Sequence, residues 1–452
     1  MARRGISRRT FLASTAATGA VVGGSWLATR QYLEPSSTQP NLIPGEPLAL
    51  TAAGKLLDTE FPDPCAGGEF LGILPFLYEA EGLPKLKPGV RIGKGHNARR
   101  IIDPASLLTP QGRNTPADQF YIRTEYPDEL QPPPDWTIQI HGEVKQSKAV
   151  SLKALLPELR SKTPVLIECT ENARELRFGL VSVGEWSGIP IQEIIKLAQP
   201  TAKAKAILIN GFDDDSTLPL TGPPFQSHSW PTCSWIYTFD QLAQAGAFLA
   251  TELNGAPLPK DQGGPVRLVV PGWYGCAEPK WVNEIKFVDD NQPATLQMQE
   301  FASRTFQPLH LDEVHPKPPG MGPEKARDYQ PAVIDQVALP VRVEAWRLDG
   351  KVAYRVVGIT WGGTKRTDKL LIRFVHANAP RFEAVQICQA KTSNPEYGVW
   401  CHRWQPKRRG GYWIEMKLGD HTVRARRMWL HSEIGRDRRI TYHARAVDIP
   451  LI

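Results

Sequence analysis

The stretch Pro164-Val-Leu-Ile-Glu-Cys169-Thr-Glu-Asn-Ala-Arg174 combines an apolar run with a cysteine at its end and a cation five residues later. The apolar run is typical of a buried β-strand. A cysteine at the mouth of a strand and near an arginine is well placed to be a thiolate, and a thiolate is a good ligand for a transition metal. A buried structural cysteine is the alternative, because free cysteines are among the most buried residues.

Strand and helix patterns alternate on both sides of this stretch. Apolar or alternating runs predict strands at residues 136–140, 206–211 and 266–270. Apolar residues at helical spacing predict helices at residues 151–159, 189–197 and 239–250. This mixture indicates an α+β or α/β core over residues 115–306.

Proline content divides the rest of the chain. Residues 307–340 contain seven prolines and predict a linker or an extended crossing segment. After them, short runs such as Val352-Ala-Tyr-Arg-Val-Val, with glycine pairs at turns, predict a β-sandwich over residues 341–452. Residues 31–114 have few periodic runs and predict an irregular N-terminal arm wrapped on the core.

Residues 1–30 have the features of an export signal. Ser7-Arg8-Arg9-Thr10-Phe11-Leu12 follows a basic start and precedes an uncharged stretch that ends at Thr29. This pattern is typical of a twin-arginine signal, which the twin-arginine export machinery reads. An accidental basic N-terminus and a membrane anchor are the alternatives. We expect an exported, periplasmic protein, with the signal either cleaved or kept as an N-terminal anchor.

Charge and cysteine spacing argue against several classes of function. The net charge is +7, but residues 1–30 hold five arginines and no acidic residue, so nucleic-acid binding is not expected. Six cysteines occur without a Cys-x-x-Cys pair, so structural zinc and c-type haem are not expected. Cys388 and Cys401 flank a predicted hairpin and are candidates for a disulfide, although folding in the reducing cytoplasm argues against a dense set of disulfides.

Five segments in a fixed order carry a resemblance to a known family. They are Phe120-Tyr-Ile-Arg123, the stretch around Cys169, Asn210-Gly-Phe-Asp213, Gly263-Gly-Pro-Val-Arg267 with its continuation to Gly275, and Lys280-Trp281. Over residues 115–300 the chain resembles the sulfite oxidase family of molybdenum enzymes. The resemblance implies an α+β fold class, in which a mixed α/β molybdopterin domain precedes an immunoglobulin-like β-sandwich.

The resemblance also implies a molybdenum–molybdopterin cofactor and the residues that hold it. Cys169 looks like the thiolate that ligates molybdenum, the remaining ligands being the pterin dithiolene and terminal oxygens. Arg267 and Lys280 match basic positions that hold the pterin and its phosphate. Asp213 matches a carboxylate that hydrogen-bonds the pterin, and Arg123 also falls among the cofactor-binding positions.

Two arginines match positions that face an oxyanion substrate in the family. They are Arg123 and Arg174, and both are assigned a catalytic role on this ground. Planar guanidinium groups suit an oxyanion because they give paired, charge-assisted hydrogen bonds. A structural ion pair is the alternative for either arginine.

The chain departs from the family pattern at several positions. Arg123 is followed by Thr124 and Glu125 where the family usually has asparagine and histidine, and Gln262 stands where a pterin-contacting histidine is common. Thr170 and Glu171 replace the usual small pair after the cysteine. The expected substrate tyrosine falls near Phe301, and a loop with an active-site tryptophan is missing. The pocket is therefore not expected to be that of a standard sulfite oxidase.

Together these features predict an exported molybdopterin-dependent oxidoreductase. Its first expected reaction is oxygen-atom transfer to sulfite or a related sulfur oxyanion. Since no haem motif or dinucleotide fingerprint is found, electrons are expected to pass to a separate carrier such as a c-type cytochrome. The C-terminal domain, with Gly358-Ile-Thr-Trp-Gly-Gly363 at a strand-turn, resembles the family's dimerisation domain and makes a homodimer an expectation.

Two alternatives remain open. The first keeps the cofactor and reverses the reaction, so that a sulfoxide such as oxidised methionine is reduced. The second is a cofactor-free interaction protein that binds a partner through its sandwich.

Overall fold

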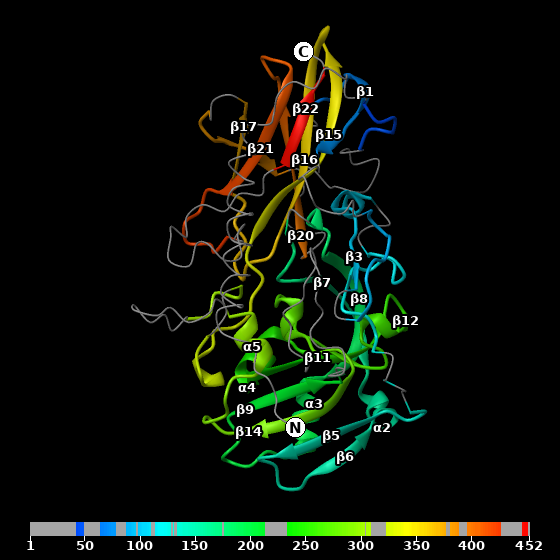
Figure 1. Ribbon diagram of the computed structural model, residues 1–452, viewed down its shortest axis with the longest axis vertical. Coiled ribbons are helices and arrows are strands. Elements are labelled where there is room, and N and C mark those ends of the chain that lie inside the picture. The colour runs from blue at the N-terminus through cyan, green and yellow to red at the C-terminus, as the bar shows by residue number, and fades with distance from the viewer. Residues whose placement is uncertain are drawn as a thin grey trace, which may run out of the picture.

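The computed structural model describes most of the chain. The described residues are 42–48, 64–77, 87–95, 98–109, 114–127, 130, 133–173, 176–212, 233–302, 304–308, 322–376, 380–387, 396–425 and 445–450. Figure 1 shows an elongated molecule with the C-terminal strands at one end and the mixed sheets at the other. Among the described residues, no helix is long and apolar enough to cross a membrane.

Two sheets form the mixed part of the molecule, at the lower end of Figure 1. The first has the order β10 (Ser234–Thr238), β9 (Ala206–Gly211), β14 (Val282–Val288), β5 (Thr137–Gly142) and β6 (Lys148–Ser151). The second has the order β12 (Ala256–Pro257), β11 (Phe248–Leu253), β8 (Val181–Pro190) and β7 (Arg160–Glu168), with β13 (Arg267–Val269) paired to β11. Strands β14 and β5 run parallel, and their neighbours pair antiparallel. The strands predicted from apolar runs are confirmed as β5, β7, β9 and β13.

Two of the predicted helices are confirmed with small changes of length. Helix α3 (Ile191–Ala198) buries one apolar face and ends where Gln199 adopts a left-handed conformation with φ 49°. Helix α2 (Leu152–Leu155) is shorter than predicted and continues as a 3₁₀ turn. Pro157 accounts for this ending, because proline has no backbone N–H to continue the helical hydrogen bonds.

The third predicted helix, at residues 239–250, is only half helical. Helix α4 (Phe239–Ala245) begins with a capping box between Thr238 and Gln241. It ends at Gly246, which has φ 65°, a conformation that glycine adopts without strain. The residues from Phe248 onward form β11 instead. A further short helix, α5 (Leu296–Glu300), follows β14.

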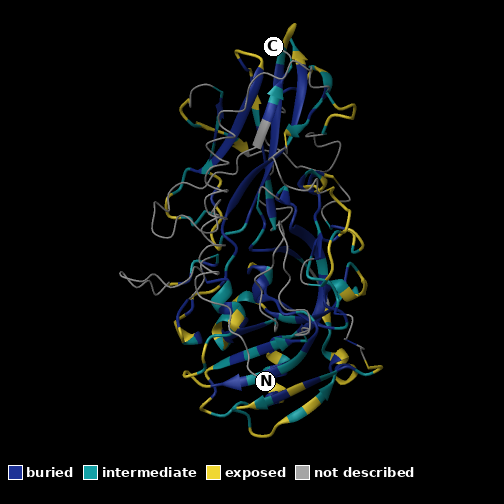
Figure 2. Cartoon of the chain, viewed as in Figure 1, coloured by how far each residue is buried: buried dark blue, intermediate teal, exposed yellow. Residues whose placement is uncertain are grey.

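Two antiparallel sheets face each other in the C-terminal β-sandwich. One has the order β1 (Glu69–Leu74), β15 (Val337–Leu348), β16 (Lys351–Trp361), β20 (Tyr397–Trp404) and β19 (Gln386–Ile387). The other has the order β18 (Glu383–Ala384), β17 (Leu370–Val375), β21 (Gly410–Leu418), β22 (Arg445–Ile449) and β2 (Phe76–Leu77). The buried residues follow the strands of both parts, while the exposed ones gather in the turns (Figure 2). The predicted mixed domain followed by a sandwich is therefore observed.

The sandwich takes in residues from outside the segment that its sequence pattern marks. Strand β1 pairs with β15 and strand β2 pairs with β22, although both lie in the segment expected to be an irregular arm. Strand β15 begins at Val337, inside the proline-rich segment expected to be a linker. These short segments become strands because β15 and β22 present backbone groups that need partners.

A fully buried ion pair lies inside one sheet of the sandwich. Glu344 and Arg355 are both 0% exposed, and Arg355 Nη2 lies 2.5 Å from Glu344 Oε2. The same carboxylate accepts the Leu48 N–H at 2.8 Å, and Arg355 donates to the Leu48 carbonyl at 2.7 Å. The pair thereby fastens the N-terminal segment 42–48 to the sandwich. Removing one partner of a buried pair is costly because the other charge stays desolvated.

We predict that Arg355→Met lowers the free energy of unfolding by about 3 kcal/mol, because Glu344 stays buried but loses one guanidinium partner. Urea unfolding followed by tryptophan fluorescence measures the change. Arg347→Met is the matched control, since its pair with Glu69 is 48% and 63% exposed. The control should change stability by less than about 0.5 kcal/mol. Equal losses in the two variants would contradict a stabilising role for the buried pair.

Candidate active site

Cys169 lies directly after β7, at the start of a turn that leads back to β8. Its side chain is 7% exposed, and its N–H donates to the Leu180 carbonyl at 3.0 Å. The N–H of Glu171 points at the cysteine sulfur, at 3.4 Å from Sγ. Burial raises the pKa of the Cys169 thiol and Glu171 raises it further, while Arg123 and Arg99 lower it. The predicted strand that ends at a buried cysteine is confirmed, and the sulfur is held by the backbone of its own turn.

Three arginines surround the carboxylate of Glu171, two residues after the cysteine. Arg123 Nε donates to Glu171 Oε2 at 2.5 Å, and Arg304 Nη1 donates to Oε1 at 3.1 Å. Arg99 Nη2 lies 3.6 Å from the same carboxylate. We call Arg99, Arg123 and Arg304 the arginine cluster. Their side chains are 3–10% exposed and that of Glu171 is 14% exposed, so four charges share one nearly dry site.

The pKa values of the charged groups in the cluster depend mainly on burial and on the interactions between the arginines and the single carboxylate. Burial alone would raise the pKa of Glu171, but Arg123, Arg304 and Arg99 together hold it well below its usual range. Burial lowers the pKa of Arg99 to about 9, with a further lowering by Arg123 and a partial recovery through Glu171. For Arg123, burial opposes the charge but Glu171 outweighs it and raises the pKa. Glu171 therefore keeps the cluster ionised.

Elements far apart in the sequence bring the cluster together. Arg99 lies on β3 (Arg99–Arg100) and Arg123 on β4 (Ile122–Arg123), and the two residues are directly opposite in an antiparallel pair. Arg304 follows α5. The sequence predicted Arg123 as a site residue but missed Arg99 and Arg304. The Arg99-Arg100 pair had no local signal, because its place depends on pairing with β4, in which Arg123 lies 24 residues after Arg99.

Arg267 and Lys280, the predicted pterin-binding residues, meet at one glycine. A Cβ on Gly263, which has φ +103°, would lie 2.8 Å from Arg267 Cβ and 3.0 Å from Lys280 Cβ. Lys280 Nζ donates to the carbonyls of Thr124 and Asp261 at 2.6 and 3.0 Å. The close approach requires glycine and brings the side-chain stems of two basic residues together, and positive charge in this region suits an anionic group.

A buried ion pair stands beside these residues. Arg267 Nη2 lies 3.4 Å from Glu278 Oε2, and both side chains are at most 5% exposed. Burial raises the pKa of Glu278 to about 7, against the opposing effects of Arg267 and of the Val270 N–H. Gln262, found in place of the family's histidine, is 4% exposed and donates to the Tyr121 carbonyl at 3.0 Å. In this structure Gln262 braces the segment that carries Arg123.

The structure also shows the surroundings of two other residues at which the chain departs from the family pattern, Glu125 and Phe301. Glu125 is paired with Arg91 and accepts the Gly95 N–H at 2.9 Å, so it is turned away from the arginine cluster. Phe301, at the expected tyrosine position, is 5% exposed and packs under the Arg304 guanidinium at 5.1 Å. Arg174 and Asp213 lie outside the described residues, and their roles stay predictions.

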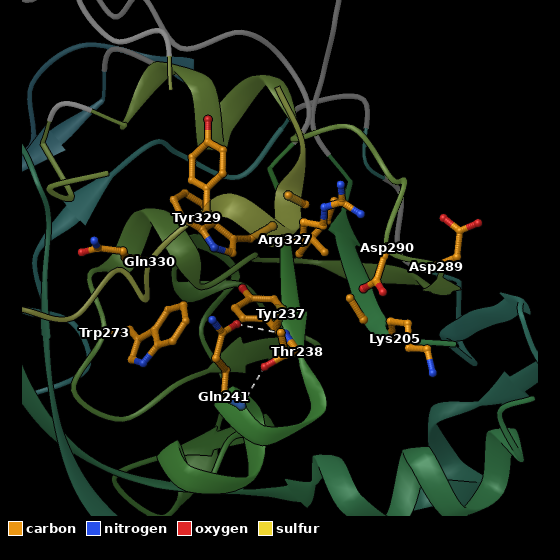
Figure 3. Close-up of a pocket in the computed structure, with 14 residues that line it drawn as sticks. Lys205, Tyr237, Thr238, Gln241, Trp273, Asp289, Asp290, Arg327, Tyr329 and Gln330 are labelled. Carbon is orange, nitrogen blue, oxygen red and sulfur yellow. Dashed lines mark hydrogen bonds between the residues drawn. The ribbon is translucent and has the colours of Figure 1, made fainter. Parts of the chain in front are cut away.

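A small pocket elsewhere in the molecule is distinct from this site. It lies beside β10 and is lined by Tyr237, Trp273 and Tyr329 among others, as Figure 3 shows. None of the site residues described above lines it. The capping hydrogen bonds between Thr238 and Gln241 close one side of it (Figure 3). We assign no part of the active site to this pocket.

The chain is similar to known proteins in both sequence and fold. Residues 124–296 match the family described as oxidoreductase molybdopterin binding domain. The catalytic subunit of the protein-methionine-sulfoxide reductase MsrP of Xanthomonas axonopodis pv. citri is 34% identical over 155 residues, which is 34% of this chain and 45% of that protein. Sulfite oxidase of Gallus gallus is 26% identical over 320 residues, 64% of this chain and 65% of that protein. The chain thus covers less than half of the first relative and under two thirds of the second.

A solved structure supports the fold. The sulfane dehydrogenase SoxCD of Paracoccus pantotrophus superposes with a TM-score of 0.54 at 18% identity, over 76% of this chain and 83% of that one.

The residues found at the site fit the cofactor that these matches imply. A buried sulfur at the end of a strand is suited to a soft metal, and Arg267 and Lys280 beside Gly263 are suited to a phosphate-bearing pterin. The cofactor of this chain is molybdenum–molybdopterin. Residues 124–296 of the chain therefore form an oxidoreductase molybdopterin-binding domain, and the chain is similar in sequence to sulfite oxidases, which are molybdenum enzymes.

Proposed function

We propose that the protein is an exported oxidoreductase that transfers an oxygen atom between its molybdenum centre and the sulfur atom of its substrate. When bound, the cofactor supplies two-electron oxygen-atom transfer. Two relatives support sulfur as the reacting atom, since one is named a methionine-sulfoxide reductase and another a sulfite oxidase. The match to a molybdopterin-binding domain speaks against the cofactor-free interaction protein.

Within this class we propose a neutral sulfoxide as the substrate and reduction as the direction. The observation that carries the proposal is Glu171, which already occupies the point where Arg99, Arg123 and Arg304 converge. A sulfite ion would have to displace a carboxylate that is tethered beside it, and breaking such buried pairs is costly. A neutral sulfoxide brings no competing charge.

The same arginines have a use in sulfoxide reduction. A sulfoxide oxygen is an acceptor, and guanidinium groups offer several N–H donors in a fixed plane. Negative charge gathers on this oxygen as the sulfur–oxygen bond breaks, and preoriented donors stabilise that charge. Glu171 holds the donors of Arg123 and Arg304 in place at 2.5 and 3.1 Å before the substrate arrives.

Oxidation of sulfite or a related sulfur oxyanion is the second candidate. The observation in its favour is the excess of positive charge, since three arginines face one carboxylate. Arg174, predicted to face the substrate, would add to this excess.

Export to the periplasm and exchange of electrons with a separate carrier such as a c-type cytochrome complete the proposal. The twin-arginine pattern at residues 7–12 supports export, with the signal either cleaved or retained as an anchor. Cys401 is disulfide-bonded, which is typical of an oxidising compartment; its predicted partner Cys388 lies outside the described residues. We further propose a homodimer formed through the sandwich.

The direction of the reaction tests the proposal. Holoenzyme from a host that makes the cofactor is given reduced methyl viologen with methionine sulfoxide, and separately ferricyanide with sulfite. We expect kcat/KM for the sulfoxide to exceed that for sulfite by at least about tenfold, equivalent to about 1.4 kcal/mol in transition-state stabilisation. A preference for sulfite of similar size would instead establish the second candidate.

We predict that Glu171→Gln tightens the binding of free oxyanions by about tenfold or more, because it removes the tethered competitor and keeps the side-chain shape. The dissociation constant of sulfate, from calorimetry on the holoenzyme, measures the effect. Glu125→Gln is the matched control, because Glu125 pairs with Arg91 outside the cluster. Unchanged sulfate binding in Glu171→Gln would contradict the role given to this carboxylate.

We predict that Cys169→Ser loses most of its molybdenum or shows a changed absorption spectrum, because an oxygen ligand replaces the soft sulfur. Wild-type protein should hold about one molybdenum per chain, measured by elemental analysis together with released pterin. Cys276→Ser is the control, since Cys276 is also 7% exposed. Full metal content and an unchanged spectrum in Cys169→Ser would show that Cys169 is a structural thiol.

A further inference from the structure

We propose that Trp361, in the C-terminal sandwich, is a positioning residue that sets the geometry of the metal-binding Cys169 through Glu168. Trp361 ends β16 and is 0% exposed. Its indole Nε1 donates to Glu168 Oε2 at 2.8 Å. Glu168 is the residue immediately before Cys169 and is 1% exposed. One hydrogen bond therefore joins the sandwich to the residue next to the cysteine.

The second oxygen of Glu168 acts on the other side of the cysteine. Asn172 Nδ2 donates to Glu168 Oε1 at 3.1 Å, and Asn172 Oδ1 accepts the Leu180 N–H at 2.9 Å. The backbone closes the same turn, since the Asn172 N–H donates to the Cys169 carbonyl at 2.9 Å. The turn that carries the sulfur is thus fixed to a carboxylate whose own orientation depends on the indole.

The indole is itself held in place by the chain that follows it. Gly362 and Gly363 have φ +76° and +81°, and a Cβ on Gly362 would lie 2.4 Å from the Asp335 carbonyl oxygen. Only glycine fits this close approach, so the backbone just after Trp361 packs directly against the backbone of Asp335. A fixed donor aimed at a buried acceptor favours one rotamer of Glu168, and through it one position of the cysteine.

Partners of this kind commonly tune a metal site without touching the metal. Residues that orient a metal ligand change metal affinity by about 10- to 100-fold when they are removed. A merely structural tryptophan would change stability alone. The two roles therefore differ in what they do to the metal centre, and this difference does not depend on which sulfur compound is the substrate.

The experiment compares Trp361→Phe with Trp400→Phe in the full-length holoenzyme. Trp400 is the matched control, because it is also 0% exposed in the sandwich but its indole donates to the Ile359 carbonyl at 3.3 Å. The readouts are the electron paramagnetic resonance spectrum of the half-reduced molybdenum, the rate of cofactor release into a chelating buffer, and the thermal midpoint. For Trp361→Phe we expect a shifted spectrum and release about tenfold faster.

Trp400→Phe should lower the thermal midpoint and leave the spectrum and the release rate at their wild-type values. The proposal is overturned if the two variants behave alike at the metal, or if Trp361→Phe keeps the wild-type spectrum and release rate. Should Trp361→Phe fail to fold, Glu168→Gln and Glu168→Ala decide the question. Glutamine retains an acceptor for the indole but loses the acceptor for Asn172 Nδ2, so it should shift the spectrum less than alanine, which loses both; equal spectra would refute the proposal.

Discussion

The carboxylate of Glu171 is the interaction on which the candidate active site depends. Three guanidinium groups in a nearly buried site repel one another and lose their hydration. An anion among them is needed to offset both the repulsion and the lost hydration free energy. Glu171 supplies that anion from the turn that also carries Cys169, so the arginines and the sulfur are fixed relative to one another. Pairing of β3 with β4 adds a second constraint, because it sets Arg99 opposite Arg123. The donors are therefore oriented before any substrate binds.

An anion that belongs to the protein changes which molecules such a site recognises. A cluster of arginines without it is a general receptor for small oxyanions, since charge attraction is the leading contribution. With Glu171 in place, recognition of a substrate depends on the geometry of its hydrogen bonds with guanidinium N–H groups that do not bind the carboxylate. The presence or absence of such a carboxylate can therefore change the substrate while the arginines and the cysteine stay the same. This explains why the identity of the substrate was hard to read from the motifs alone.

The parts of this structure that the sequence predicted are those encoded in short runs. The strand that leads to Cys169 and the strand at residues 206–211 both follow from contiguous apolar segments. Arg99 and Arg304 could not be predicted, because their partner Glu171 is 72 and 133 residues away in the chain. Likewise β1 and β2 form a short apolar run interrupted by Gly72 and Pro75, and their place in the sandwich depends on pairing with β15 and β22, which lie far away in the chain. The predicted helix at residues 239–250 divides into α4 and β11 because Gly246 ends the helix.

The position of β7 gives the sandwich a part in the active site. Strand β7 lies at the edge of its sheet, next to β8, and an edge strand has backbone groups without a partner in the sheet. Glu396 of the sandwich segment accepts the Leu166 N–H of β7 at 2.5 Å, three residues before the cysteine. Trp361 contacts the same strand at Glu168. Since β8 holds one edge of β7 and the sandwich contacts it at these two residues, the cysteine is presented from a strand whose position depends on both parts of the molecule. The sandwich, which we propose to form the dimer, is thereby also a support for the proposed metal ligand, and the two roles would place separate constraints on its sequence.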